Sequence, residues 1–279
     1  MQHRRAPRWP WPVWVLGIYG LFVGVAACGL LADEGSAAPT PAQPPAFNVL
    51  VFTRTTGFRH SSIGAGVTAL RELGAEHGFG VTHTEDPQVF SDEGLGAYQA
   101  VVFLNTTGDV LNAEQQAAFE RYIGAGGGFV GVHSASDTEY DWPWYGGLVG
   151  AYFASHPAIQ QAELQVVRGD HPSTVGLPAR WTRTDEWYNF RAPPGDEVQV
   201  LLTIDEASYS GGTMGASHPM SWYHLYAGGR AWYTALGHTE ASYAEPLFRA
   251  HLLGGVQWAA GVSESPGDVR AYLPLLDHR

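Results

Sequence analysis

The sequence predicts an α/β fold with a mostly parallel central sheet, and three observations lead to that prediction. Short apolar runs alternate with helical patterns through the first half of the chain, an order typical of βαβ units. Several of these runs are continuously apolar, as expected for strands buried on both faces of a sheet. The 279 residues are 45% hydrophobic and 15% charged, which suits one large domain or two small ones. We therefore expect a flavodoxin-like, three-layer arrangement.

The first half of the chain predicts four strands and two helices. One helix is predicted over 63–77, where apolar residues recur at helical spacing. A second is predicted over 112–123, with Asn112 as its N-cap. The strands are predicted at 47–53, 78–84, 98–104 and 129–132.

The second half is less regular and carries many aromatic residues in its loops. A closing helix is predicted over 243–260. Buried core packing explains such aromatic residues, but exposed rings would suit the flat faces of sugars. Strands are predicted at 161–167, 197–203, 220–225 and 230–236.

Charge and composition exclude several classes of function. The chain has 27 acidic and 15 basic residues, so nucleic acid is not an expected partner. Every basic residue is arginine, which excludes Schiff-base catalysis and a lysine-bearing phosphate loop. Cys28 is the single cysteine, so neither an internal disulfide nor a cysteine metal cluster can form.

The first 46 residues predict export. Residues 1–28 combine early arginines with an apolar run and end in Val-Ala-Ala-Cys28, which resembles a bacterial lipobox. Lipidation of Cys28 would tether a cell-surface lipoprotein to the membrane only through its anchor. The alternatives are an ordinary signal peptide cleaved after Ala37, giving a secreted protein, and an uncleaved anchor. Residues 29–46 predict a Pro/Ala-rich linker, 47–262 the folded domain and 263–279 a C-terminal tail.

Four polar residues are the candidates for chemistry: three follow predicted strands, and the fourth follows a further strand-like segment just before Trp187. In parallel α/β sheets the carboxyl ends of the strands face the ligand site. Two or three imidazoles and a carboxylate at that edge could bind a divalent metal such as zinc, or act as general acid and base. No two of them have the close spacing of a local zinc motif, and each taken alone could simply order a loop. The four residues are His60, His133, Glu186 and His238.

Further residues near these positions are candidates for substrate binding. Arg59 could bind a hydroxyl or a carboxylate, with a surface salt bridge as the alternative. Asp137 could orient an imidazole or act as a ligand, with helix capping as the alternative. The aromatic candidates are Trp187, Tyr188 and Trp222. His156 and His171, each followed by proline, look like histidines that order loops, although His156 could reach the site.

Several motifs together resemble the ThuA-like (trehalose utilisation) family, over about residues 47–260. They are Thr-Gly-Phe-Arg-His60, the glycine-rich stretch 126–137, Tyr152-Phe-Ala-Ser-His-Pro157, Asp185-Glu-Trp-Tyr188, His218-Pro-Met-Ser-Trp222 and Ala235-Leu-Gly-His-Thr239. The family is similar in fold to class I glutamine amidotransferases, whose nucleophilic cysteine sits at a sharp turn after the central strand. Here that turn falls at 132–134, so His133 occupies or adjoins the nucleophile position and thiolate chemistry is excluded.

The resemblance implies a role in carbohydrate metabolism, with keto-disaccharides related to trehalose as substrates. On this hypothesis His133, Glu186 and His238 are catalytic, Glu186 is the general base, and His60, His133 and His238 are metal ligands. The rival hypothesis is a non-catalytic carbohydrate-binding or scaffold domain on the cell surface. Convergence of His60, His133, Glu186 and His238 would favour the enzyme.

Overall fold

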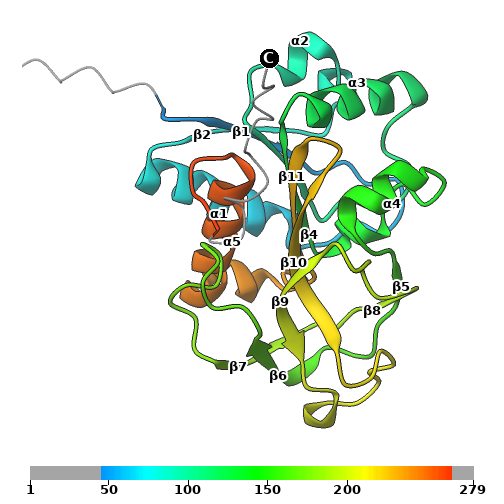
Figure 1. The fold of residues 1–279 in the computed structure, drawn as a ribbon, viewed down its shortest axis with the longest axis vertical. Helices are drawn as coiled ribbons and strands as arrows, with labels where there is room; N and C mark the ends of the chain where they lie inside the picture. The colour runs from blue at the N-terminus through cyan, green and yellow to red at the C-terminus, as the bar shows by residue number, and fades with distance from the viewer. Residues whose placement is uncertain (1–44, 266–279) are drawn as a thin grey trace, which may run out of the picture. The chain divides into compact units, whose positions relative to one another are not determined.

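Five neighbouring strands form the parallel part of the central sheet (Figure 1). The computed structural model describes residues 45–265. The five strands, in spatial order, are β2 (Gly80–Thr84), β1 (Asn48–Phe52), β3 (Ala100–Leu104), β4 (Gly128–Val132) and β11 (Gly229–Thr234). All their pairings are parallel. β3 and β4 are buried along their whole length, so the continuous apolar runs predicted them correctly.

Four further strands form the antiparallel part of the same sheet. In order after β11 they are β10 (His218–Tyr226), β9 (Gln199–Ile204), β6 (Gln160–Val166) and β7 (Arg180–Asp185). Each pairing reverses the chain direction, so β7 again runs in the same sense as the parallel strands. Irregular register beside Ser221, between β10 and β9, is the kind of feature that increases local twist.

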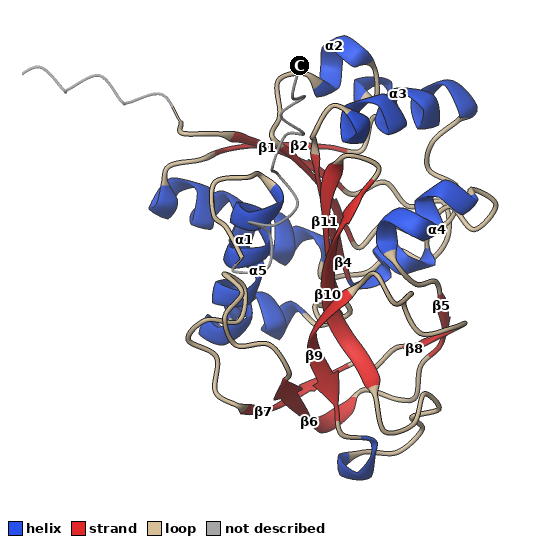
Figure 2. Ribbon diagram, viewed as in Figure 1, coloured by secondary structure: helices blue, strands red, loops and turns tan. Residues whose placement is uncertain are grey.

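Helices cover both faces of the sheet and complete the three layers (Figure 2). One face carries α1 (Ile63–His77) and α5 (Pro246–Ala259), and the other carries α2 (Asp92–Leu95), α3 (Ala113–Gly124) and α4 (Pro143–Val149). The predicted N-cap of α3 is confirmed, because Asn112 forms a capping box with Gln115. The predicted α/β fold with a mostly parallel sheet is likewise confirmed.

The closing helix begins later than predicted. A short 3-10 helix, η4 (Glu240–Ala244), comes first, and Pro246 then occupies the first turn of α5. Proline favours that position because it has no amide hydrogen to leave unpaired. The apolar pattern continues through both segments, so periodicity alone could not place the break.

Several short elements escaped the sequence prediction because they have too few residues to show a period. The pair β5 (Phe153–Ser155) and β8 (Asn189–Phe190) forms a separate antiparallel sheet. The short helices α2 and α4 also went unpredicted, as did η1 (Pro87–Val89), η2 (His133–Asp137) and η3 (Glu206–Ser208).

Aromatic packing holds α3 against the parallel part of the sheet. The Phe103 ring centroid lies 5.5 Å from that of Phe119 on α3 and 5.6 Å from that of Phe129 on β4. All three side chains are fully buried, and truncating one to alanine would cost about 3–5 kcal/mol. This core packs α3 against β3 and β4, the strand that leads into His133.

Parts of the predicted domain organisation fall outside the described residues. These are the signal peptide over 1–28 with Cys28, nearly all of the linker over 29–46, and most of the tail over 263–279. Within residues 45–265, no helix has both the length and the apolar character that crossing a membrane requires.

Candidate functional site

His133 stands at the sharp turn where β4 passes into η2. Its backbone is left-handed, with φ of 50°, a conformation that residues other than glycine adopt uncommonly. The imidazole Nδ1 lies 2.8 Å from the carbonyl oxygen of Ala235. Because a carbonyl only accepts hydrogen bonds, Nδ1 carries the hydrogen. The other ring nitrogen, Nε2, faces the site, 3.1 Å from His238 Nδ1.

His238 lies in the loop after β11, the strand that pairs with β4. The carboxylate of Asp185, at the end of β7, fixes this loop by accepting hydrogen bonds from the amides of Gly237 at 2.9 Å and His238 at 3.1 Å. Asp185 is fully buried and also forms an ion pair with Arg183 at 3.1 Å. β10, β9 and β6 separate β7 from β11 in the sheet, so Asp185 joins segments distant in sheet order.

Glu186 follows Asp185 directly and reaches into the site. Its Oε2 lies 3.1 Å from His238 Nδ1 and 3.5 Å from His133 Nε2, while its Oε1 lies 2.9 Å from His156 Nδ1. Burial raises the pKa of the Glu186 carboxyl, but hydrogen bonds with His133 and His238 outweigh burial and hold the pKa well below its usual range. The carboxylate is therefore ionised, and it is a weak base.

His60 completes the group from the loop between β1 and α1. Its Nδ1 lies 3.3 Å from Ser134 Oγ, and its ring is nearly perpendicular to those of His133 and His238, with centroids 4.9 and 5.1 Å away. Burial, followed by the neighbouring imidazoles of His133 and His238, lowers the pKa of His60 to about 3. The ring is therefore neutral over the physiological range, as a metal ligand must be.

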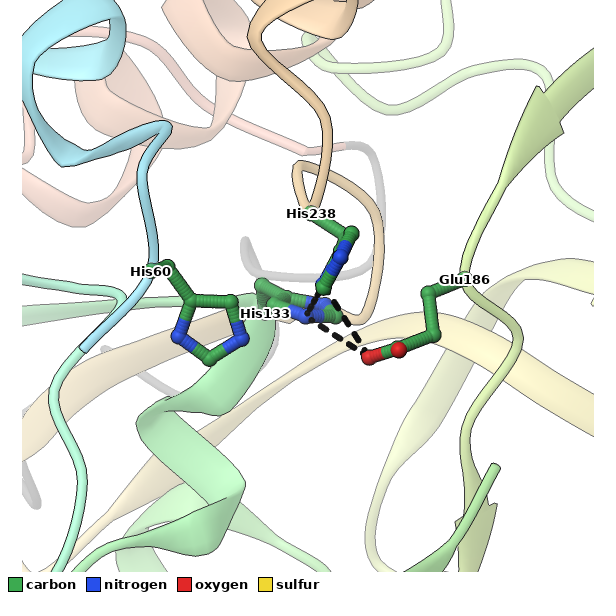
Figure 3. Close-up of side chains that lie close together, drawn as sticks. All are labelled: His60, His133, Glu186 and His238. Carbon is green, nitrogen blue, oxygen red and sulfur yellow. Dashed lines mark hydrogen bonds and ion pairs between the residues drawn. The ribbon is translucent and has the colours of Figure 1, made fainter. Parts of the chain in front are cut away.

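Together these four side chains can hold a divalent metal ion (Figure 3). One potential ligand atom from each of His60, His133, Glu186 and His238 lies within 4.8 Å of all the others. Tetrahedral zinc with Zn–N bonds of 2.0–2.1 Å places its ligand atoms about 3.3 Å apart. The separations around Glu186 Oε2, His133 Nε2 and His238 Nδ1 are 3.1, 3.1 and 3.5 Å. The donor set and the spacing of these three atoms fit zinc, and Ala235 supplies the outer carbonyl partner typical of a histidine ligand.

The other predicted site residues lie outside the cluster of four. Arg59 forms an exposed ion pair with Glu85 at 2.6 Å, as the salt-bridge alternative predicted, and both residues also line the pocket beside His60. Asp137 ends η2, where it accepts a hydrogen bond from Tyr140 Oη at 2.6 Å, and burial raises its pKa. Asp137 therefore stays close to His133 without joining the cluster of four.

Trp187, Tyr188 and Trp222 do not form the exposed aromatic rim that their positions suggested. All three are buried. Trp187 Nε1 donates to the carbonyl of Gln160, and Trp222 Nε1 to that of Val149, so both indoles have their polar atom satisfied inside the protein. The Tyr188 ring lies over His133, with centroids 4.2 Å apart. Because all three are buried, none of them offers a free face to a sugar.

Sequence reasoning missed Phe58, the exposed aromatic residue beside the cluster. Its side chain is 67% exposed, and its ring lies edge to face with His60 at 4.9 Å. The loop is pinned to the segment after β3, because Thr107 Oγ1 donates to the Phe58 carbonyl at 2.7 Å. The pattern that could have revealed it is an apolar residue inside a polar loop, two positions before His60.

A pocket of about 500 Å³ adjoins His60 between its loop and the start of α1. It is open to solvent and of mixed polarity. Its lining includes Arg59, His60, Ile63, Arg71, His83 and Glu85. Of the four cluster residues, His60 is the one that lines this pocket.

A protein-family model matches most of the folded domain and shows which family the chain belongs to. The model of the ThuA family, described as trehalose utilisation, matches residues 48–259. The chain belongs to the ThuA family. A crystal structure described as ThuA-like, from Bacteroides uniformis ATCC 8492, has a TM-score of 0.68 and 24% identity, covering 82% of this chain and 97% of that one. Another, from Parabacteroides merdae ATCC 43184, has a TM-score of 0.65 and 22% identity, covering 80% and 94%.

The ThuA fold also resembles part of a larger enzyme. A β-galactosidase from Bacillus circulans sp. alkalophilus has a TM-score of 0.52 and 15% identity, covering 77% of this chain and 31% of that one. These identities establish a shared fold and nothing further. A search of curated proteins found no match to this ThuA-family chain.

Proposed function

We propose that this ThuA-family protein is a metal-dependent enzyme acting on keto-disaccharides related to trehalose. The observation that carries the proposal is the convergence of His60, His133, Glu186 and His238 within 4.8 Å. Buried imidazoles and an ionised carboxylate that face one another are better explained by a shared cation than by loop ordering. The non-catalytic alternative loses support because it gives no reason for the four side chains to meet.

The proposed reaction begins with removal of a proton from the carbon beside the sugar's keto group. The metal would supply positive charge that stabilises the resulting enolate oxygen. His60, His133 and His238 would hold the metal, with Glu186 as the charged ligand. A carboxylate that coordinates the metal has its lone pairs engaged and is a poor proton acceptor, so we revise the predicted role of Glu186 as general base. Asp137 is the better-matched base, because burial raises its pKa.

The substrate side of the site rests on Phe58 and the pocket beside His60. An exposed aromatic face adjacent to the cluster suits the apolar face of a pyranose ring. The pocket of about 500 Å³ has room for a sugar unit and carries polar groups for its hydroxyls.

The deciding experiment is elemental analysis of the purified protein, followed by assays on keto-disaccharides with and without a chelator. We expect about one zinc or similar divalent ion per chain and activity that is lost with the chelator and restored by the metal. Absence of bound metal after reconstitution, or full activity with the chelator present, would contradict the proposal.

Assigning roles to the two carboxylates requires variants. Glu186→Gln should lower metal occupancy, whereas Asp137→Asn should keep the metal and lose turnover. The reverse pattern would return the role of general base to Glu186.

We further propose that the protein is exported and attached to the membrane only through a lipid on Cys28, with secretion as the alternative. The lipobox-like end of residues 1–28 supports this location. Intact-mass analysis of membrane-extracted protein should give a diacylated chain beginning at Cys28. A chain beginning at Ala38 would contradict the anchor.

A further inference from the structure

Glu186 uses its two oxygens on opposite sides of the site. Oε2 faces His133 and His238 within the cluster, whereas Oε1 lies 2.9 Å from Nδ1 of His156. His156 contributes no ligand atom to the cluster of four. Its side chain is 44% exposed, so it stands between the buried cluster and solvent.

The hydrogen on His156 is fixed by its surroundings. Nδ1 also lies 3.0 Å from the carbonyl oxygen of Pro157. A carbonyl and an ionised carboxylate can only accept, so Nδ1 carries the hydrogen whether the ring is neutral or charged. His156 therefore donates to Glu186 Oε1 and leaves Oε2 free for the cluster.

Local structure holds the two residues at this distance. His156 follows β5, and Glu186 comes shortly before β8, and these two strands pair with each other. The His156 ring also lies nearly parallel to those of Phe153 and Tyr188, with centroids 5.9 and 6.2 Å away. The small β5–β8 sheet thus aligns a hydrogen-bond donor with the carboxylate of the cluster.

We propose that His156 is a positioning residue of the metal centre, holding Glu186 in the orientation that coordinates the ion. The inference rests on the proposed metal centre. Carboxylate ligands are commonly hydrogen-bonded from outside the coordination shell, and loss of such a partner weakens metal affinity about 10–100-fold.

The test is zinc affinity of the full-length protein, measured by competition with a chromophoric chelator. His156→Ala should weaken zinc binding about 10–100-fold. His156→Asn should stay within a few-fold of wild type, because the Asn amide nitrogen is the same number of bonds from the backbone as Nδ1. His77→Ala, at an exposed histidine in the last turn of α1, is the matched control and should bind like wild type.

A double-mutant cycle separates positioning from a general structural effect. Because His156 acts through Glu186, His156→Ala should add little to the loss already caused by Glu186→Gln. If wild type and His156→Ala bind zinc equally, or if the two losses are independent, this inference is overturned while the metal centre stands. If wild type binds no zinc, both proposals fail.

Discussion

The parallel and antiparallel parts of the sheet contribute different groups to the same site. The parallel part supplies three imidazoles from the ends of its strands, since His60 follows β1, His133 follows β4 and His238 follows β11. The antiparallel part supplies one carboxylate, Glu186 after β7. The nitrogen ligands thus come from one part and the carboxylate from the other. A metal centre assembled in this way depends on both parts of the sheet.

The largest expected effect comes from removing an imidazole of the parallel part. His238→Ala should bring zinc content far below one ion per chain, because a direct ligand is lost, whereas Glu186→Gln should retain weaker binding through its amide oxygen. Metal analysis of both variants after reconstitution tests this ranking. The ranking would be reversed if the His238→Ala protein retained zinc and the Glu186→Gln protein contained none.

The next effect concerns Asp185, which joins the two parts. Asp185→Asn should lower the free energy of unfolding by about 3 kcal/mol, because buried Arg183 loses part of its countercharge and the loop carrying His238 loses an ionised acceptor. Denaturant unfolding measures the loss. Asp170→Asn, at an exposed carboxylate, is the control and should change stability little. Equal stability of the two variants would show that this junction is unimportant.

A smaller effect concerns acid stability and a buried histidine of α5, the helix beside the parallel part. Burial lowers the pKa of His251 to about 4 from its ordinary 6.5. The unfolded chain therefore binds a proton that the folded chain does not between about pH 6.5 and 4, so the free energy of unfolding decreases as pH falls through that window. His251→Gln should reduce the slope by up to about 1.4 kcal/mol per pH unit. An unchanged slope would mean that His251 is already protonated in the folded protein.

The smallest effect concerns Phe58, on the substrate side of the parallel part. Phe58→Ala should weaken keto-disaccharide binding about 5–10-fold through loss of stacking, with zinc affinity and stability unchanged because the side chain is exposed. Phe58→Tyr keeps the ring and should bind like wild type. Calorimetry on zinc-loaded wild type, Phe58→Ala and Phe58→Tyr measures their affinities for the keto-disaccharide. Equal affinities of wild type and Phe58→Ala would remove Phe58 from the substrate site.

The sequence was most informative where a site residue directly follows a strand that its own apolar residues reveal. The continuous apolar runs located β3 and β4, and the residue after β4 is His133. Parallel strands align their carboxyl ends, so proximity of His133 and His238 could be anticipated before the pairing of β4 with β11 was known.

The antiparallel part was harder to anticipate because its geometry is set by long-range pairing. No local pattern shows that β7 ends beside the loop after β11, where Asp185 meets Gly237. His156 is placed by β5 and β8, which are three and two residues long and too short for periodicity. Trp222 resembled a surface aromatic residue in the sequence, but packing against Tyr233 buries it.

The left-handed backbone of His133 affects which residue is most stable at that position. Glycine tolerates a φ of 50° freely, whereas a side chain there costs about 1–2 kcal/mol. A glycine would thus recover backbone energy that partly offsets the lost imidazole packing. The chain therefore keeps a strained backbone at the centre of its sheet, at the residue that brings an imidazole into the site.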